Sequence, residues 1–373
     1  MLRKHTPYFH KFVELGAELG DRIGFDAAVV FTSTQEEHLA TRNAVGIYDV
    51  YSQGPIDVKG PDAARLLTHV AARDVERRAA DDGQVLYTSF LNESGGIVDD
   101  LTIYRLGREH FWVVATPARA SVVEDTLARH ADGMRAYLTN TIPGTAYLSV
   151  QGPRSRELLG ALTDADLSTD ALPYFRFTHA DVAGVPTVLS RTGYSGELGY
   201  ELYYPRDYAE GMWDAVLEAG RPLEAAPAGL GALRSVRIEK RYPLYGLDLD
   251  ESTSPLEAGL GWAVDLDRDG FVGADALRRQ RDDGVARTLV GLSFADLEPL
   301  PKPGDVVLAD GEEIGAVTSA DRGWALGRSL ALAYVRPDTA RQDASLTVAG
   351  DASWPATVSL EPFYDPKGER VRA

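Results

Sequence analysis

The segment from Asn92 to Leu101 constrains the fold more than any other part of the chain, because a Gly-Gly pair there separates two apolar runs. Such a pattern predicts a β-hairpin. Side chains alternate along a strand, so Asp99 shares the face of Leu101 and Ile103, whereas Asp100 points to the opposite face. A carboxylate on an apolar face must be paired or used in chemistry. The alternative is that both acids flank a turn in water.

The composition limits the classes of protein to consider. A chain of 373 residues with 44% hydrophobic and 25% charged residues predicts two or three globular domains. Because it has no cysteine, disulfides, thiolate metal sites and a cysteine nucleophile are excluded. The seven histidines show no metal-ligand spacing, so we expect no metal site. No apolar run has the length of a membrane span or of a signal peptide, so we expect a cytoplasmic protein.

The net charge of −18 argues against nucleic acids and anionic membranes as partners. An anionic ligand would therefore need a local cluster of arginines. Arg234, Arg237 and Arg241 recur at helical spacing and are candidates to hold an anion such as a glutamate tail. The alternative is a charged helix face in water.

A weak internal repeat predicts two related α+β modules. Val58–Leu67 and Val150–Leu159 both have the pattern of a strand that ends at a Gly-Pro pair and is followed by an amphipathic helix. Proline is tolerated at the first helical position because the N–H that it lacks would be unpaired there. Chance similarity is the alternative, since Gly-Pro helix starts are common.

Two further patterns complete the expected architecture. Ser33–Glu37 has the residues of a capping box and predicts a helix that continues to about Asn43. After about Ala276, short apolar runs alternate with Gly, Pro and Asp turns, which is typical of a small all-β barrel. We therefore expect an α+β fold, with an α+β region at 1–275 and a β-barrel domain at 276–373.

The segment Arg191–Leu202 is rich in glycine and carries two candidate ligand contacts. Its three glycines would let the backbone approach a flat ligand closely. Tyr194 offers a stacking face, and Glu201 could accept two donors from an amino-pyrimidine edge. The segment lacks the pattern of a nucleotide-binding loop. The alternative is an ordinary hairpin with a surface Tyr and Glu.

Taken together, these segments resemble the tetrahydrofolate-dependent aminomethyltransferase family, whose best-known member is the T-protein of the glycine cleavage system. The resemblance runs over essentially the whole chain, with the pieces in the family's order. They are Thr6–Phe9, Arg42 before Val45–Asp49, Val58–Pro61, Gly95–Asp100, Val150–Pro153, Arg191–Glu197, Arg237–Glu239, Leu244–Asp248, Phe271–Gly273 and Gly315–Ser319.

The resemblance implies a folate channel between two interleaved, duplicated α+β modules, with a C-terminal all-β barrel as a cap. It implies tetrahydrofolate as cofactor and Asp100 as the catalytic carboxylate near the reactive folate nitrogen. The other residues that it places along the cofactor are Tyr87, Val98, Tyr194, Glu201 and Arg237.

The chain departs from the family at the end of the site where the one-carbon donor would bind. Ser52 stands where the family has a histidine, and Leu233 stands where it has an arginine, with Arg234 beside it. We therefore favour a demethylase that moves a methyl group from an O-, N- or S-methyl small molecule to tetrahydrofolate. The residues expected to line its substrate pocket are Phe31, Tyr51, Gln53 and Tyr245.

Two other functions remain open. The first is an ordinary T-protein that takes an aminomethyl group from a lipoyl carrier protein. The second is a non-enzymatic folate-binding assembly factor, but that branch carries a cysteine motif and this chain has no cysteine. The expected partners are a small-molecule methyl donor or acceptor and a lipoyl carrier protein, without nucleic acid or membrane.

Overall fold

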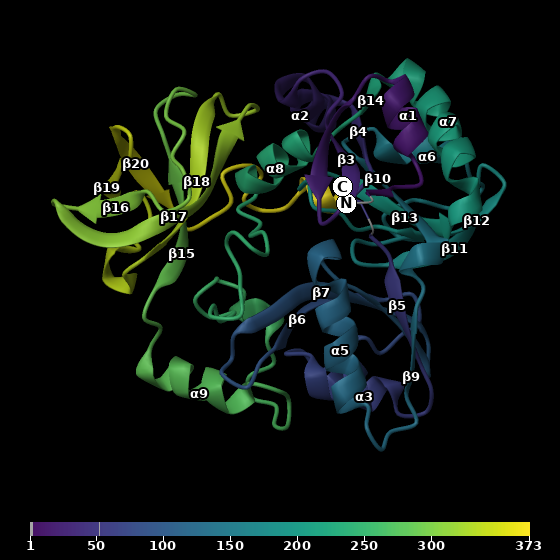
Figure 1. Cartoon of the computed structure of the whole chain (residues 1–373), viewed down its shortest axis with the longest axis horizontal. Coiled ribbons are helices and arrows are strands. Elements are labelled where there is room, and N and C mark those ends of the chain that lie inside the picture. The colour runs from purple at the N-terminus through teal and green to yellow at the C-terminus, as the bar shows by residue number, and fades with distance from the viewer. Residues whose placement is uncertain (1–2, 52) are drawn as a thin grey trace.

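The computed structural model describes residues 3–51 and 53–373, which form two α+β modules and a β-barrel (Figure 1). The first module contains an antiparallel sheet in the order β6-β7-β8-β5-β9, with α3 and α5 packed on one face. Its core includes Leu67, Val123 and Leu127 from these helices. The bounds are β5 Pro55–Lys59, α3 Ala63–Val70, α4 Val75–Arg78, β6 Val85–Leu91, β7 Ile97–Gly107, β8 His110–Val114, α5 Ala120–His130 and β9 Tyr137–Asn140.

The second module has a six-stranded sheet in the order β11-β12-β13-β10-β4-β14. Its core contains Tyr8, Phe12 and Trp213, contributed by the N-terminal segment and α7. The bounds are α1 Phe9–Glu14, α2 Thr34–Asn43, β4 Val45–Tyr48, β10 Thr145–Gln151, α6 Ser155–Gly160, β11 Phe177–Val182, β12 Val185–Ser190, β13 Gly199–Pro205, α7 Ala209–Gly220, β14 Ala225–Pro227 and α8 Leu230–Glu239. A small sheet of β1 (Lys4–His5), β3 (Phe25–Val30) and β2 (Glu18–Arg22) lies beside it.

The two modules are interleaved along the chain. Strand β4 precedes the whole first module in sequence, yet it pairs with β10 and β14 of the second sheet. This arrangement confirms the expected α+β fold with interleaved modules.

The repeated strand–Gly-Pro–helix unit is present in both modules, as β5 followed by α3 and as β10 followed by α6. Gly60 and Gly152 have φ values of +125° and +142°, and a Cβ atom on either would lie within 2.3 Å of a backbone oxygen. Only glycine fits such a position. One detail differs from the expectation: each helix begins two residues after its proline, so the proline precedes the helix cap instead of occupying the first helical position.

The C-terminal part is a closed barrel in the order β15-β18-β17-β16-β19-β20. Its core contains Val290, Leu292, Val317 and Val358. Helix α9 connects it to the first module, and the expected boundary near residue 276 falls inside this helix. The bounds are α9 Ala274–Asp283, β15 Thr288–Ser293, β16 Val306–Ala309, β17 Glu312–Gly323, β18 Arg328–Val335, β19 Ser345–Ala349 and β20 Ser353–Ser359.

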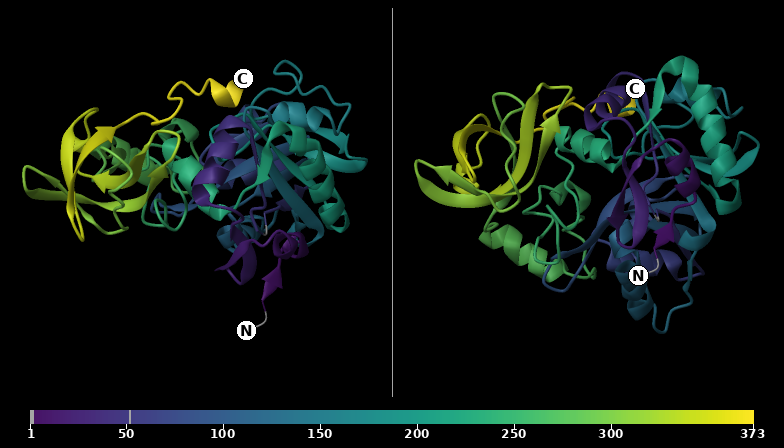
Figure 2. Two further views of the ribbon diagram at one scale, coloured as in Figure 1. Left: turned by 90° about the horizontal axis from the view of Figure 1, so that it is seen from above. Right: turned by 45° about the horizontal axis from the view of Figure 1, so that its top comes forward.

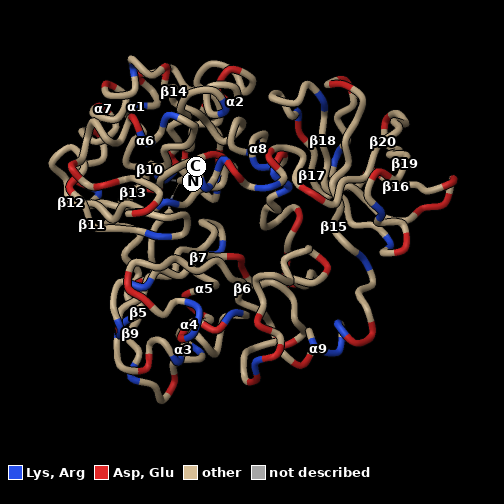
Figure 3. The backbone as a smooth tube through the Cα atoms, turned by 180° about the vertical axis from the view of Figure 1, so that it is seen from behind, with Lys and Arg blue, Asp and Glu red and all other residues tan. Residues whose placement is uncertain are grey.

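After β20 the chain leaves the barrel and returns to the second module, as the yellow segment in Figure 2 shows. The main-chain N–H of Tyr364 donates to Glu239 O at 2.9 Å, and the side chains of Arg191 and Arg156 donate to Ala373 O at 2.6 and 2.7 Å. Acidic residues are distributed along the chain in all three parts (Figure 3). No helix of the described residues is both long and apolar enough to cross a bilayer.

Ser33 caps helix α2 as expected, since its hydroxyl accepts from Glu36 N at 3.1 Å; of the reciprocal part of a capping box, the described contacts show only the Ser33 hydroxyl donating to Glu36 Oε2 at 3.1 Å. Near its end, buried Arg42 donates to Glu239 at 2.8 Å and to Glu197 at 3.0 Å. It also donates to Ser195 O and Val236 O, both at 2.9 Å. One guanidinium thus joins α2, the glycine-rich turn and α8 in an interior where its charge is balanced by two carboxylates.

We expect Arg42→Met to destabilise the protein by about 3–5 kcal/mol, because the change removes the buried cation that the two buried carboxylates share. Equilibrium urea unfolding followed by circular dichroism measures the difference. Arg154→Met is the matched control, since Arg154 pairs with Glu157 on an exposed helix face and little change is expected there. Equal effects of the two substitutions would contradict the assignment.

Candidate functional site

The hairpin predicted at 92–101 is present, formed by β6 and β7. The Asn92 side-chain oxygen accepts from Ser94 N at 3.0 Å and from Gly96 N at 2.9 Å, which fixes the turn. A Cβ on Gly96 would lie 1.8 Å from Glu251 O, so the turn needs glycine because it packs against the loop after α8.

Asp99 lies on the apolar face with Leu101 and Ile103, as the alternation predicts, and it is fully buried. Its Oδ2 accepts from Thr116 N at 2.9 Å, and burial raises the pKa of its carboxyl well above the usual range. The reading of Asp99 as a turn residue in water is therefore wrong. Asp99 orders the connection between β8 and α5.

Asp100 lies on the opposite face and keeps partial solvent access. The Tyr87 hydroxyl donates to its Oδ2 at 2.9 Å. Burial raises the pKa of Asp100 to about 6, although the Tyr87 hydrogen bond opposes this rise. A desolvated but accessible carboxyl with a pKa near neutrality can either hold or release a proton under ordinary conditions.

Two aromatic rings lie close to Asp100. The Tyr87 ring stacks on Trp262 with centroids 5.4 Å apart, and Trp262 is 63% exposed. The Tyr194 ring stacks on Tyr242 at 5.7 Å, and its hydroxyl donates to Pro243 O. Burial raises the pKa values of Tyr87 and Tyr194, and the negative charge of Asp100 adds to both rises. The structure therefore brings Tyr87, Asp100 and Tyr194 together.

Glu201, on β13, lies in a ring of hydroxyl groups. Tyr147 donates to its Oε1 at 2.7 Å, and Thr192 and Tyr104 donate to its Oε2 at 2.5 and 3.4 Å. Burial raises the pKa of Glu201, while these hydrogen bonds act in the opposite direction. A carboxylate held in this way keeps free lone pairs for the N–H donors of a ligand.

Sequence reasoning missed the residues of this ring. A signal for Tyr104 was present, since it follows Asp100 by four residues on the same strand and therefore shares its face. Tyr147 pairs with Tyr203 across β10 and β13, and such a cross-strand register could not be read from the sequence.

The glycines of the segment Arg191–Leu202 do not serve the purpose expected of them. A Cβ on Gly193 or Gly199 would lie within 2.2 Å of the Gln151 side chain, and one on Gly196 would lie 2.1 Å from Lys240. The turn needs glycine because these two protein side chains pack against it. Close approach of a ligand is not the reason.

The expected arginine cluster is not formed. Arg237 is buried and donates to Asp248 Oδ2 at 2.7 Å and to Tyr242 O at 2.9 Å. Arg234 is exposed, and Arg241 donates instead to Leu289 O at 3.1 Å, at the barrel. Arg237 therefore fixes the loop that carries Tyr242, and a direct role for it in cofactor binding stays a prediction.

The four residues predicted for the substrate pocket lie in different surroundings. Phe31 packs on Trp213 at 6.2 Å, beside the core of the second module, and Tyr51 lies 6.4 Å from Phe25. The Tyr245 ring lies 4.7 Å below the guanidinium of Arg119. Gln53 lines a separate pocket that also contains Phe25. The structure does not gather these residues around one cavity.

Val98, Leu233 and Ser52 were also singled out from the sequence. The Val98 side chain packs in the first module's core, and its carbonyl accepts from Arg119 Nε at 2.8 Å. Leu233 packs against Tyr48 and Ala232. Ser52 lies outside the described residues.

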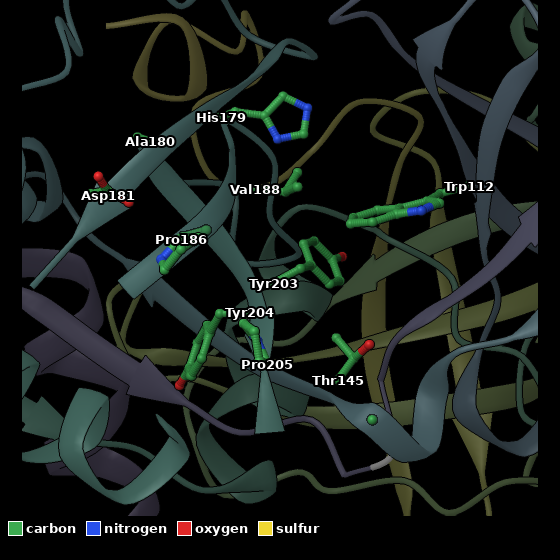
Figure 4. Close-up of a pocket in the computed structure, with 12 residues that line it drawn as sticks. Trp112, Thr145, His179, Ala180, Asp181, Pro186, Val188, Tyr203, Tyr204 and Pro205 are labelled. Carbon is green, nitrogen blue, oxygen red and sulfur yellow. The ribbon is translucent and has the colours of Figure 1, made fainter. Parts of the chain in front are cut away.

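The pocket shown in Figure 4, of about 510 Å³, is not the candidate site. Trp112, His179, Val188 and Tyr203 are among its lining residues, whereas Tyr87, Asp100 and Tyr194 are not. The candidate site is instead recognised by its chemical groups. Carboxyl groups and phenols are desolvated there and still partly accessible, as in an interior channel. Two carboxylates and stacking rings suit a flat heteroaromatic ring that carries N–H donors, and the pterin of a folate has these properties.

Comparisons with known proteins agree with this geometry. Residues 8–268 match the GCVT N-terminal domain, and residues 287–365 match the glycine cleavage T-protein C-terminal barrel domain. The aminomethyltransferase of Halothermothrix orenii is 40% identical over 92% of this chain and 95% of its own length. That of Moorella thermoacetica is 39% identical over 97% and 98%.

Among solved structures, the glycine cleavage system aminomethyltransferase T from Bartonella henselae superposes with a TM-score of 0.89 at 27% identity. The match covers 98% of this chain and 99% of that one. The two matching family models together span most of the chain, and the two relatives are near 40% identical over nearly their full length. These matches establish the family. The chain belongs to the glycine cleavage T-protein family and is a tetrahydrofolate-dependent one-carbon transferase.

Proposed function

We propose that this protein is an aminomethyltransferase that takes its one-carbon unit from a lipoyl-bearing carrier protein. Two relatives named aminomethyltransferase, at 40% and 39% identity and aligned along nearly their whole length, support this function. The comparisons favour it over the demethylase that the sequence analysis put first. Within the structure, the accessible carboxyl of Asp100 and its bond to Tyr87 carry the proposal.

Tetrahydrofolate supplies, when bound, the nitrogen that accepts the one-carbon unit. Asp100 is proposed as the catalytic residue that holds or moves a proton at its free Oδ1, while Oδ2 stays bonded to the Tyr87 hydroxyl. An ionised Asp100 can also stabilise positive charge that develops during transfer. The acceptor at the pterin edge is proposed to be Glu201, with the Tyr194 ring as a stacking surface. Val98 and Arg237 complete the proposed cofactor residues.

A demethylase is kept as the second candidate because of one feature. Leu233, where the family has an arginine, packs against apolar neighbours and offers no charge to a donor. An apolar position there suits the methyl group of a small methylated donor. The residues predicted for its pocket, Phe31, Tyr51, Gln53 and Tyr245, do not surround one cavity and therefore do not support this candidate.

The two candidates differ in their donor, so one experiment separates them. Purified protein with tetrahydrofolate receives either the aminomethyl-loaded lipoyl carrier protein or a panel of O-, N- and S-methyl compounds. We expect ammonia release with the carrier and no methyl transfer from the panel. Methyl transfer without ammonia release would replace the first candidate by the second. Calorimetric titration with tetrahydrofolate tests cofactor binding independently.

We expect Asp100→Asn to lower turnover by about 10²–10⁴-fold, because the substitution keeps the shape and removes the acid–base group. Tetrahydrofolate binding should be nearly unchanged, which calorimetry checks. Asp99→Asn is the matched comparison, since Asp99 faces Thr116 on the other side of the strand, and it should mainly lower stability. An active Asp100→Asn beside an inactive Asp99→Asn would reverse the two assignments.

The rate should fall as the pH drops through about 6, where the Asp100 carboxylate becomes protonated. In Tyr87→Phe, the fall of kcat/KM on the acid side of the pH–rate profile should occur at higher pH. The lost hydrogen bond had favoured the ionised carboxylate, so its removal raises the pKa of Asp100 further. A pH–rate profile measures the shift, with exposed Tyr137→Phe as control. A fall that stays in place or moves to lower pH would contradict this role of Tyr87.

A further inference from the structure

A second pocket, of about 680 Å³, is not lined by Tyr87, Asp100 or Tyr194. The N-terminal strand β1, the segment after β4 and the start of α5 enclose it. Its polar lining includes Lys4, Asp49, Gln53, Tyr147 and Arg206. Only Tyr147 also belongs to the candidate site, and Lys4, Asp49 and Arg206 have no part in the proposed reaction.

Asp49 is the unusual group in this pocket. Its Oδ2 atom is shielded from solvent and has no hydrogen-bond partner in the described part of the chain. A buried carboxylate oxygen without a donor is unfavourable unless something else supplies one. Burial also raises the pKa of Asp49 to about 7, although Thr6 and Arg206 act in the opposite direction. Asp49 thus lines the pocket with a carboxylate whose Oδ2 is shielded and has no donor among the described residues.

Two cations border the same pocket. The charge of Arg206 reaches Asp49, but its guanidinium donates to His5 O at 3.2 Å and leaves Asp49 Oδ2 without a partner. Lys4 Nζ lies 5.3 Å from the centre of the Phe25 ring. Groups of opposite charge therefore line one cavity without neutralising one another directly, and a ligand could bridge them.

We propose that this pocket binds a small zwitterion of the amino-acid type. The ammonium group of the ligand donates to Asp49, and its carboxylate lies against Arg206 and Lys4. An ammonium group suits the charge of the Asp49 carboxylate, and a carboxylate suits the two cations. Neither a simple amine nor a simple acid would match both ends of the pocket.

The position of Tyr147 connects this pocket to the one-carbon chemistry. Tyr147 lines the pocket and donates its hydroxyl to Glu201 at 2.7 Å. An occupant would therefore contact a residue that holds the proposed pterin acceptor. The proposed zwitterion site nevertheless stands without the proposed function, because its residues are separate from Asp100.

The test is isothermal titration of the full-length protein, without folate or carrier protein, with glycine, alanine, leucine and phenylalanine. Methylamine and acetate serve as probes that carry only one charge. We expect at least one amino acid to bind and both single-charge probes to bind far more weakly. Asp49→Asn and Arg206→Gln should each weaken binding by about tenfold or more, since each removes a charged hydrogen-bonding partner.

Asp181→Asn is the matched control, because Asp181 is a carboxylate of the other pocket and binding should be unchanged there. Thermal unfolding of each variant shows whether the fold is retained. If a variant unfolds, the comparison of amino acids with single-charge probes on the unaltered protein still decides the matter. No binding of any amino acid, equal binding of methylamine or acetate, or full binding by both variants would overturn the proposal.

Discussion

The buried guanidinium of Arg42 is the interaction on which the arrangement of the parts depends. Its partners come from three segments that are far apart in sequence: the turn at Ser195–Glu197, helix α8, and Tyr364 of the C-terminal segment, whose ring lies 4.1 Å away. Glu239 is bound from a second side by His38, 3.3 Å away. Burial opposes ionisation, but His38 and Arg42 together hold the pKa of Glu239 below its usual range. These three segments and α2 are thus held together by buried charges that cannot be separated without a large free-energy cost.

The candidate site shows the opposite electrostatic arrangement. There burial raises the pKa values of Asp100 and Glu201, because phenol hydroxyls and not cations surround them. A hydroxyl donor stabilises a carboxylate less than a full positive charge does. Asp100, with a pKa of about 6, is therefore kept close to the point where it exchanges a proton. The contrast with Glu239 separates residues that hold the fold from residues suited to chemistry.

Local patterns predicted much of this architecture. The hairpin, the opposite faces of Asp99 and Asp100, the Ser33 cap and the repeated Gly-Pro units all follow from spacing within a few residues. The sequence analysis could not foresee the pairs that depend on distant packing. Arg237 was expected to bind a ligand anion, but its guanidinium donates to the Asp248 carboxylate. Asp248 in turn accepts from the Ser319 hydroxyl of the barrel at 2.7 Å. The glycines after Arg191 were assigned to a ligand, whereas Gln151 and Lys240 fill the space beside them.

The return of the chain after β20 has a mechanical consequence. The chain connects the barrel to the rest of the molecule through α9 at one end and through the segment from Tyr364 to Ala373 at the other, and the barrel also packs directly against α8. A body held by two tethers on different neighbours cannot swing away as a lid held by one linker can. Opening it requires the release of the second tether, including the bonds of Arg191 and Arg156 to Ala373 O. The barrel and the second module should therefore lose amide-exchange protection together, as one cooperative unit.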